Sequence, residues 1–286
     1  MQVACFIKSF QDMPFDRFCR ALYEQGFDGV DLTVRNGGSI EPADVEAKLP
    51  AAVNTLHEQG LKFLFLSTDL TAPDATADRV LGTAAQLGID RIKLGYNRYV
   101  PFGTLAKQID DTRRRLAEMA ALGRKHRVLP CVHIHSGTYM SSHGTLLYEV
   151  IKDFAPDEIG AYVDPLHMTL EGAGAGWQQG LDLLAPWIAL VAVKNFAWHS
   201  ADRDKSGQMR WRTEVVPLAD GVAPLPDFFA MLRKTGYDGT YSLHSEYKGK
   251  HSFKDLSTDE CLAQTAEDLK YFRSLVSPAE RKASAR

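Results

Sequence analysis

Two histidines end the most regular apolar segment of the chain. The segment PCVHIH, residues 130–135, alternates as β-strands do, in which side chains two residues apart lie on the same face. Cys131, His133 and His135 are therefore expected on one face, directly before a Ser-Gly turn. A single buried histidine is usually a hydrogen-bonded core residue. Two on one face favour a site that binds a metal ion or transfers protons.

Three later apolar segments also end in residues that can do chemistry. The first ends at Asp164, with His167 three residues on; the second places Ala192 and Lys194 on one face; the third places His244 and Glu246 on one face. Imidazole, carboxylate and ammonium groups at the ends of four successive strands are what the catalytic mouth of a β/α barrel requires.

Apolar and amphipathic segments alternate along the whole chain. The expected strands are 3–8, 29–33, 62–67, 91–95, 131–135, 159–164, 190–195 and 241–246, and the expected helices are 15–25, 42–59, 75–87, 105–126, 145–154, 178–184, 225–234 and 258–275. Gly26, Gly60, Gly88 and Gly236 follow helical segments, as glycines at helix C-termini do. This order predicts an α/β fold, a (β/α)₈ TIM barrel in a single domain over 1–276, with a disordered C-terminal tail over 277–286.

Composition narrows the class of protein. The formal net charge of -3 over 286 residues argues against a nucleic-acid partner, which needs a basic face. The four cysteines are scattered, which favours free thiols in a reducing compartment. We find neither a signal peptide nor an apolar stretch long enough for a membrane span, so we expect a cytoplasmic protein without a membrane partner.

Loops after the strands should build the site. The segments 136–144 and 165–176 are read as two of these loops, the second with a flexible glycine run. The longest loop, 196–223, contains Trp198 and Trp211 and is predicted to be a lid or a contact in a possible homo-oligomer.

Five short motifs carry a family resemblance. They are GFDGVDL (26–32), VDPLH (163–167), VKN (193–195), PLADG (217–221) and GYDG (236–239). In this order they resemble the xylose isomerase-like TIM barrels, a superfamily of sugar isomerases, sugar epimerases, inosose dehydratases and endonuclease IV. The resemblance covers nearly the whole chain and implies the TIM barrel fold.

The resemblance also implies a divalent metal held by side chains of strands five to eight. The matching positions here are His133, Asp164, Ala192 and His244, and Asp164 alone keeps the usual ligand type. His167 matches a family histidine that contacts substrate, and Lys194 matches a family lysine. The chain therefore resembles a divergent branch.

Four side chains form the predicted metal site: His133, Asp164, His244 and Glu246. Two nitrogens and two carboxylates suit one divalent ion of Mn, Zn, Co or Fe better than Mg. Such an ion would polarise a carbonyl and stabilise an enediolate.

The predicted catalytic residues are Glu246, His135, Lys194 and His167. Glu246 is the first candidate for the base and His135 the second. Lys194 would stabilise an oxyanion, or else form a buried ion pair with Asp164. His167 would contact substrate, or else anchor a loop by a hydrogen bond. Lys93, Trp198 and Tyr247 are predicted to bind substrate.

These residues predict a metal-dependent isomerase or epimerase that acts on a small-molecule carbohydrate, a sugar or polyol derivative, through an enediolate. A lyase or dehydratase acting on a keto-sugar or 3-keto-glycoside is the alternative. A DNA repair endonuclease is disfavoured by the balanced charge. A metal-free binding or assembly subunit is favoured by Ala192 and opposed by the histidines.

Overall fold

The computed structural model describes residues 1–276, and the predicted tail 277–286 lies outside them. Eight parallel strands close into one barrel in the order β1-β10-β7-β6-β5-β4-β3-β2. They are β1 (Gln2–Phe6), β2 (Gly29–Val34), β3 (Lys62–Thr68), β4 (Arg91–Lys93), β5 (Leu129–His133), β6 (Gly160–Val163), β7 (Ile188–Val193) and β10 (Thr240–Leu243). The predicted TIM barrel is confirmed.

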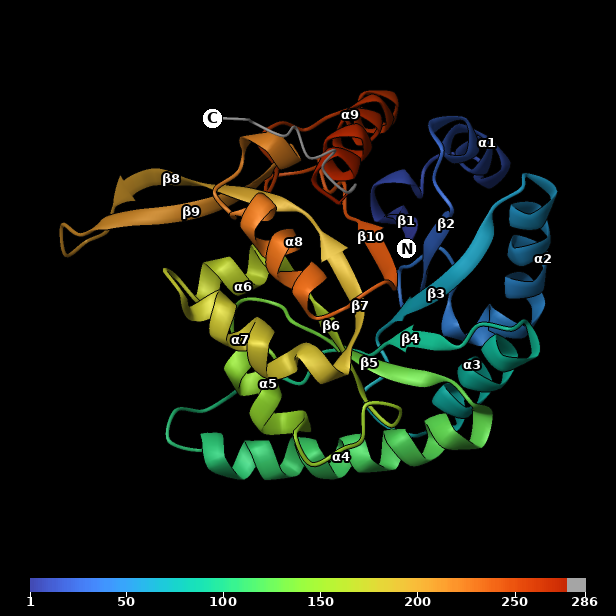
Figure 1. The fold of residues 1–286 in the computed structure, drawn as a ribbon, viewed down its shortest axis with the longest axis horizontal. Helices are drawn as coiled ribbons and strands as arrows, with labels where there is room; N and C mark the ends of the chain where they lie inside the picture. The colour runs from blue at the N-terminus through green and yellow to red at the C-terminus, as the bar shows by residue number, and fades with distance from the viewer. Residues whose placement is uncertain (277–286) are drawn as a thin grey trace, which may run out of the picture.

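Helices surround the barrel (Figure 1). They are α1 (Phe15–Gln25), α2 (Val45–Glu58), α3 (Ala75–Gln86), α4 (Leu105–His126), α5 (Gly144–Ile151), α6 (Pro165–Glu171), α7 (Gly176–Leu184), α8 (Leu225–Lys234) and α9 (Thr258–Val276). Local sequence sets several of their ends. The side chain of Asp74 caps α3 by accepting a hydrogen bond from the backbone N–H of Ala77. Gly26 ends α1 with a φ of 89°, a conformation that glycine adopts without a steric cost.

The apolar side chains form two layers. A small cluster fills the inside of the barrel and includes Phe65, Cys131, Tyr162 and Ala192. A larger cluster lies between the strands and the surrounding helices. Among residues 1–276, no helix combines the length and the apolar composition needed to span a membrane.

Two predicted loops are regular structure instead. The segment 165–176 begins with α6, because Asp164 caps this helix and Pro165 occupies its first position. The segment 196–223 contains an antiparallel hairpin of β8 (Asn195–Arg203) and β9 (Met209–Val216). The hairpin extends away from the barrel (Figure 1). Its two strands are stabilised by hydrogen bonds to each other rather than by burial, so no buried apolar run in the sequence predicts them.

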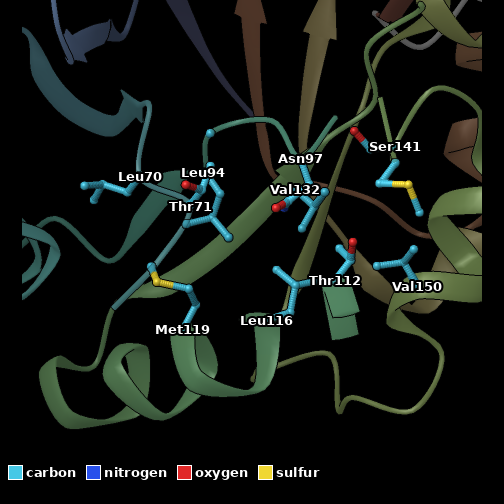
Figure 2. Close-up of a pocket in the computed structure, with 12 residues that line it drawn as sticks. Leu70, Thr71, Leu94, Asn97, Thr112, Leu116, Met119, Val132, Ser141 and Val150 are labelled. Carbon is cyan, nitrogen blue, oxygen red and sulfur yellow. The ribbon is translucent and has the colours of Figure 1, made fainter. Parts of the chain in front are cut away.

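A small cavity lies between the barrel wall and α4 (Figure 2). Its volume is about 10 Å³, room for about one water molecule. Leu116 and Met119 of α4 face Val132 of β5 across it, and the buried hydroxyl of Thr112 has no hydrogen-bond partner among residues 1–276. None of the predicted site residues lines this cavity. The candidate site therefore lies elsewhere, among the polar side chains at the C-terminal ends of the strands.

The contact between α5 and α7 gives a stability prediction. A Cβ atom on Gly144 would lie 2.5 Å from the Cα atom of Gly180, whereas a Cβ on Gly176 would meet no atom within 4 Å. Both glycines are the first residues of their helices. We expect Gly144→Ala to lower the free energy of unfolding by about 1–3 kcal/mol through overpacking. Gly176→Ala should leave it unchanged or raise it by up to about 1 kcal/mol. Urea denaturation measures both, and equal values would contradict this packing.

Candidate functional site

The predicted site residues converge on one end of the barrel. His133 ends β5, Asp164 directly follows β6, Lys194 follows β7 and His244 follows β10. The strands are parallel, so their C-terminal ends open at the same mouth. Several strands end earlier in the structure than the sequence predicts. His135 and Glu246 therefore lie in the loops just beyond β5 and β10.

Asp164 is the centre of the cluster and is fully buried. Its Oδ1 accepts a hydrogen bond from the backbone N–H of His167 at 3.2 Å. Its Oδ2 faces three nitrogens: His133 Nε2 at 3.2 Å, Lys194 Nζ at 3.3 Å and His167 Nε2 at 3.6 Å. Burial alone would raise the pKa of Asp164, but Lys194 and the histidines outweigh it and the pKa lies below its usual value. Asp164 is therefore a buried anion.

Lys194 lies between two carboxylates because β7 lies between β6 and β10. Its Nζ is 3.3 Å from Asp164 Oδ2 and 3.8 Å from Glu246 Oε1. Burial lowers the pKa of Lys194, yet the two carboxylates more than compensate and raise it above its usual value. Lys194 is therefore a buried ammonium, and the ion pair with Asp164 that the sequence allowed is present.

The other oxygen of Glu246 pairs with a lysine from the first strand's end. Lys8 Nζ lies 2.8 Å from Glu246 Oε2. Burial alone would raise the pKa of Glu246, but Lys194, His244 and Lys8 together hold it well below its usual range. A carboxylate held this firmly as an anion is a weak base.

His133 is neutral and engaged at both ring nitrogens. Its Nδ1 lies 2.9 Å from the hydroxyl of Tyr96, and its Nε2 lies 3.2 Å from Asp164 Oδ2. Burial, followed by the nearby charge of Lys194, lowers the pKa of His133 well below its usual value. The network assigns the proton to Nε2, which donates to Asp164, while Nδ1 accepts from Tyr96.

A second polar layer lies beneath this cluster. His244 Nε2 is 2.9 Å from the hydroxyl of Tyr162, whose ring stacks on His133 with centroids 4.1 Å apart. Ser242 donates a hydrogen bond to Asp31 Oδ2 at 2.9 Å, and this oxygen lies 3.7 Å from His244 Nε2. All of these side chains are buried.

His135 is at the more open side of the mouth and is partly exposed. Its Nδ1 lies 3.0 Å from the carbonyl oxygen of Ser136, so Nδ1–H donates there. Burial and the charge of Lys194 lower the pKa of His135 to about 4. No hydrogen bond within residues 1–276 involves its Nε2, which leaves a lone pair that can accept a proton. His167 packs beside it, with ring centroids 4.0 Å apart, and its Nδ1 lies 2.8 Å from Ser136 Oγ, the loop anchor that the sequence allowed.

Lys93, at the end of β4, also points into the mouth. Its Nζ donates to the carbonyl oxygen of Thr68 at 3.2 Å and lies 3.7 Å from the ring centroid of Tyr96. Burial, with repulsion from Arg35, lowers the pKa of Lys93 to about 7. Lys93 therefore changes charge near neutral pH, unlike Lys194.

The arrangement of donors does not fit the predicted divalent ion. Within residues 1–276, no group of three or more His, Cys, Asp or Glu side chains is arranged to hold a metal. The Lys194 ammonium lies beside both carboxylates, at 3.3 Å from Asp164 and 3.8 Å from Glu246. His133 directs its two nitrogens at Tyr96 and Asp164. A metal at these carboxylates would face the fixed positive charge of Lys194.

Two predicted substrate-binding residues do not join the cluster. Tyr247 is buried among the outer helices, and its hydroxyl hydrogen-bonds to Asp268 of α9. Its ring therefore points away from the mouth, because it lies one residue after Glu246 on the opposite side of the chain. Trp198 is on β8 of the hairpin, 47% exposed, with its ring against Phe196.

Sequence reasoning missed three members of the cluster. Lys8 ends the first predicted strand, Asp31 interrupts the apolar second strand, and Tyr162 shares a strand face with Asp164. Each carried a signal, since a polar residue in or just after a buried strand requires a partner.

Lys93 gives a prediction about stability and pH. In the folded chain its pKa is about 7, against a usual value of 10.5, so between these values the unfolded chain binds the extra proton. Stability linked to this group therefore rises as pH rises from 7 to 10.5. We expect Lys93→Met to be more stable than the wild type at neutral pH, by on the order of a few kcal/mol, and the difference to shrink toward pH ~10. Chemical denaturation across this range tests it; a constant difference would contradict the buried, neutralised amine.

Known proteins share this architecture. The structure of L-ribulose 3-epimerase superposes with a TM-score of 0.71 at 18% identity, covering 100% of this chain and 99% of that one. The probable 3-DHS dehydratase AsbF from Bacillus anthracis gives 0.68 at 18% identity, covering 94% and 99%. A xylose isomerase-like TIM barrel protein from Mycobacterium smegmatis, in complex with magnesium, gives 0.66 at 16% identity, covering 96% and 98%.

At these identities the solved structures establish the fold alone. A search of curated proteins finds no match. The family model described as xylose isomerase-like TIM barrel matches residues 19–275, most of the barrel and every residue of the cluster except Lys8. The chain therefore belongs to the xylose isomerase-like TIM barrel family.

Proposed function

We propose that this chain is an enzyme that isomerises or epimerises a sugar or a sugar derivative by moving a proton next to a carbonyl group. One observation carries the proposal: a neutral imidazole with a free lone pair, His135, lies in the same mouth as a buried ammonium, Lys194. Membership of the family supports a carbohydrate substrate, and a solved relative of the same fold is named as a sugar epimerase.

The proposed reaction begins when a base removes the C–H proton beside the substrate's carbonyl. The electron pair of that bond moves into a carbon–carbon double bond, and the carbonyl oxygen becomes an enediolate oxygen. Returning the proton to the former carbonyl carbon isomerises the sugar, as the hydroxyl proton on the neighbouring oxygen passes to the former carbonyl oxygen. Returning a proton to the other face of the same carbon, with the carbonyl re-formed in place, epimerises it. No step here uses the divalent ion that the sequence predicts, because the donor arrangement does not fit it.

We propose His135 as the base in preference to Glu246. Glu246 is tied to Lys8 and Lys194, so its proton affinity is low. His135 is neutral above pH ~4 and its Nε2 has no partner in the described chain. Lys194 supplies the positive charge for the developing oxyanion, and Lys93 is the remaining candidate for binding substrate oxygens.

A lyase is the second candidate. After the same proton abstraction, the enediolate electrons can expel an oxygen substituent on the next carbon as the double bond forms. His135 and Lys194 would serve this elimination equally well, and a solved relative of the same fold is named as a dehydratase. We also propose a cytoplasmic location, which four buried, unpaired cysteine thiols support.

Solvent exchange tests the proposed reaction. The protein is incubated in D₂O with a panel of ketoses and 3-keto-glycosides, and products are followed by NMR and ultraviolet absorbance. We expect deuterium at a single carbon of the product, because the abstracted proton equilibrates with solvent. A new unsaturated chromophore would instead identify the lyase. Product that carries no deuterium under prolonged turnover would contradict proton transfer through His135.

The pH profile identifies the base. Protonation of His135 removes its lone pair, so kcat/KM should stay constant from about pH 5 to 7 and fall as pH drops through about 4. His135→Asn should lower kcat by about 10²–10⁴-fold. Glu246→Gln is the matched comparison, and its melting temperature is measured alongside. A larger loss in kcat for Glu246→Gln with unchanged stability would transfer the role of base to Glu246.

A further inference from the structure

Lys194 occupies the place where a cation would bridge two carboxylates of the mouth, the buried Asp164 and the partly buried Glu246. Its Nζ lies 3.3 Å from Asp164 Oδ2 and 3.8 Å from Glu246 Oε1, and its side chain is buried. The two carboxylates come from the strands on either side of β7. Any ion bound by both carboxylates would therefore have to displace this ammonium.

We propose that Lys194 replaces the divalent cation in this chain, excluding a metal from the mouth and supplying the positive charge that the reaction uses. The second half of this statement rests on the proposed function. The first half concerns binding alone and holds for any reaction.

Local charge supports the replacement. Lys194 and Lys8 already pair with Asp164 and Glu246, so a divalent ion at these carboxylates would add positive charge directly beside the Lys194 ammonium. A metal would also have to compete with the ammonium at a separation of a few ångströms, where the repulsion between like charges is strong.

The histidine network supports it independently. His133 Nε2 donates to Asp164 and His133 Nδ1 accepts from Tyr96, so neither nitrogen directs a lone pair between the carboxylates. His244 turns its Nε2 to the hydroxyl of Tyr162. His133 is thus committed to protein partners. His244 Nδ1, 3.5 Å from Glu246 Oε1, and His167 Nε2, 3.6 Å from Asp164 Oδ2, have no hydrogen-bond partner within residues 1–276, so they could serve as ligands once Lys194 is removed.

The ammonium still has a donor to offer. Lys194 carries three N–H groups and faces two carboxylates, so at most two of these groups are directed at them. The third can donate to an enediolate oxygen, which is the electrostatic role that a metal performs in other barrels.

Metal binding by three proteins tests the first half of the proposal. Wild type, Lys194→Ala and Lys93→Ala are treated with EDTA, dialysed and heated with and without ~1 mM Mn²⁺, about 1,000-fold above a micromolar Kd. Bound manganese is measured by elemental analysis on the same samples. Lys93→Ala is the matched control, because Lys93 is also buried in the mouth but, within residues 1–276, forms no ion pair with a carboxylate.

We expect Mn²⁺ to leave the melting temperatures of wild type and Lys93→Ala unchanged within about 1 °C. It should raise that of Lys194→Ala by about 5 °C or more, because Asp164 then lacks its ammonium partner and Glu246 keeps only Lys8. Should Lys194→Ala fold only with Mn²⁺ present, the proposal is equally supported; should it not fold at all, Lys194→Gln is measured in its place. Stoichiometric manganese in the wild type, or none in a folded Lys194 variant, would overturn the proposal.

Activity separates this proposal from the proposed function. In the deuterium exchange assay, the rate of EDTA-treated wild type should be unaffected by added Mn²⁺, and Lys194→Gln should lose about 10²-fold or more in kcat. A rate that vanishes with EDTA and returns with Mn²⁺ would overturn the catalytic half. If no substrate exchanges while the Lys194 variant still gains Mn²⁺, the proposed function fails and the replacement of the metal stands.

Discussion

The ion pair of one ammonium with two carboxylates is the interaction on which the mouth of this barrel depends. Removing a charge from water costs several kcal/mol, so the fully buried Asp164 and the partly buried Glu246 remain ionised because cationic side chains lie beside them. Strand order supplies that cation, since β7 with Lys194 lies between β6 and β10. Barrel closure and charge balance are therefore coupled, and loss of Lys194 would leave Asp164 without its ammonium partner and Glu246 with Lys8 alone.

The same charges set the protonation of the surrounding side chains. Burial together with the charge of Lys194 keeps His133 and His135 neutral. His133 then serves as a fixed link between Asp164 and Tyr96, while His135 retains a lone pair at the open side. The mouth thus combines a rigid positive charge with a neutral base, the two groups that an enediolate reaction needs.

Much of the fold was predictable because its signals are local. Strand and helix positions follow from apolar periodicity, and the polar strand ends identified Asp164, Lys194 and His244 before any coordinates. The side-chain partners were not predictable in the same way. Whether Lys194 contacts Asp164 or a substrate depends on strands that are neighbours in the barrel but far apart in sequence. The hairpin 195–216 was not predicted either, because its two strands are stabilised by hydrogen bonds to each other. Tyr247 follows β10 in a segment without regular structure, and its hydroxyl pairs with Asp268 of α9, a partner that local sequence does not reveal.

The identity of the cation between Asp164 and Glu246 decides this account. Anomalous diffraction at the manganese edge, from crystals grown with Mn²⁺, would locate any metal directly. We predict no anomalous peak in the mouth and density for the Lys194 ammonium beside both carboxylates. A peak coordinated by Asp164 and Glu246, with Lys194 turned away, would contradict it.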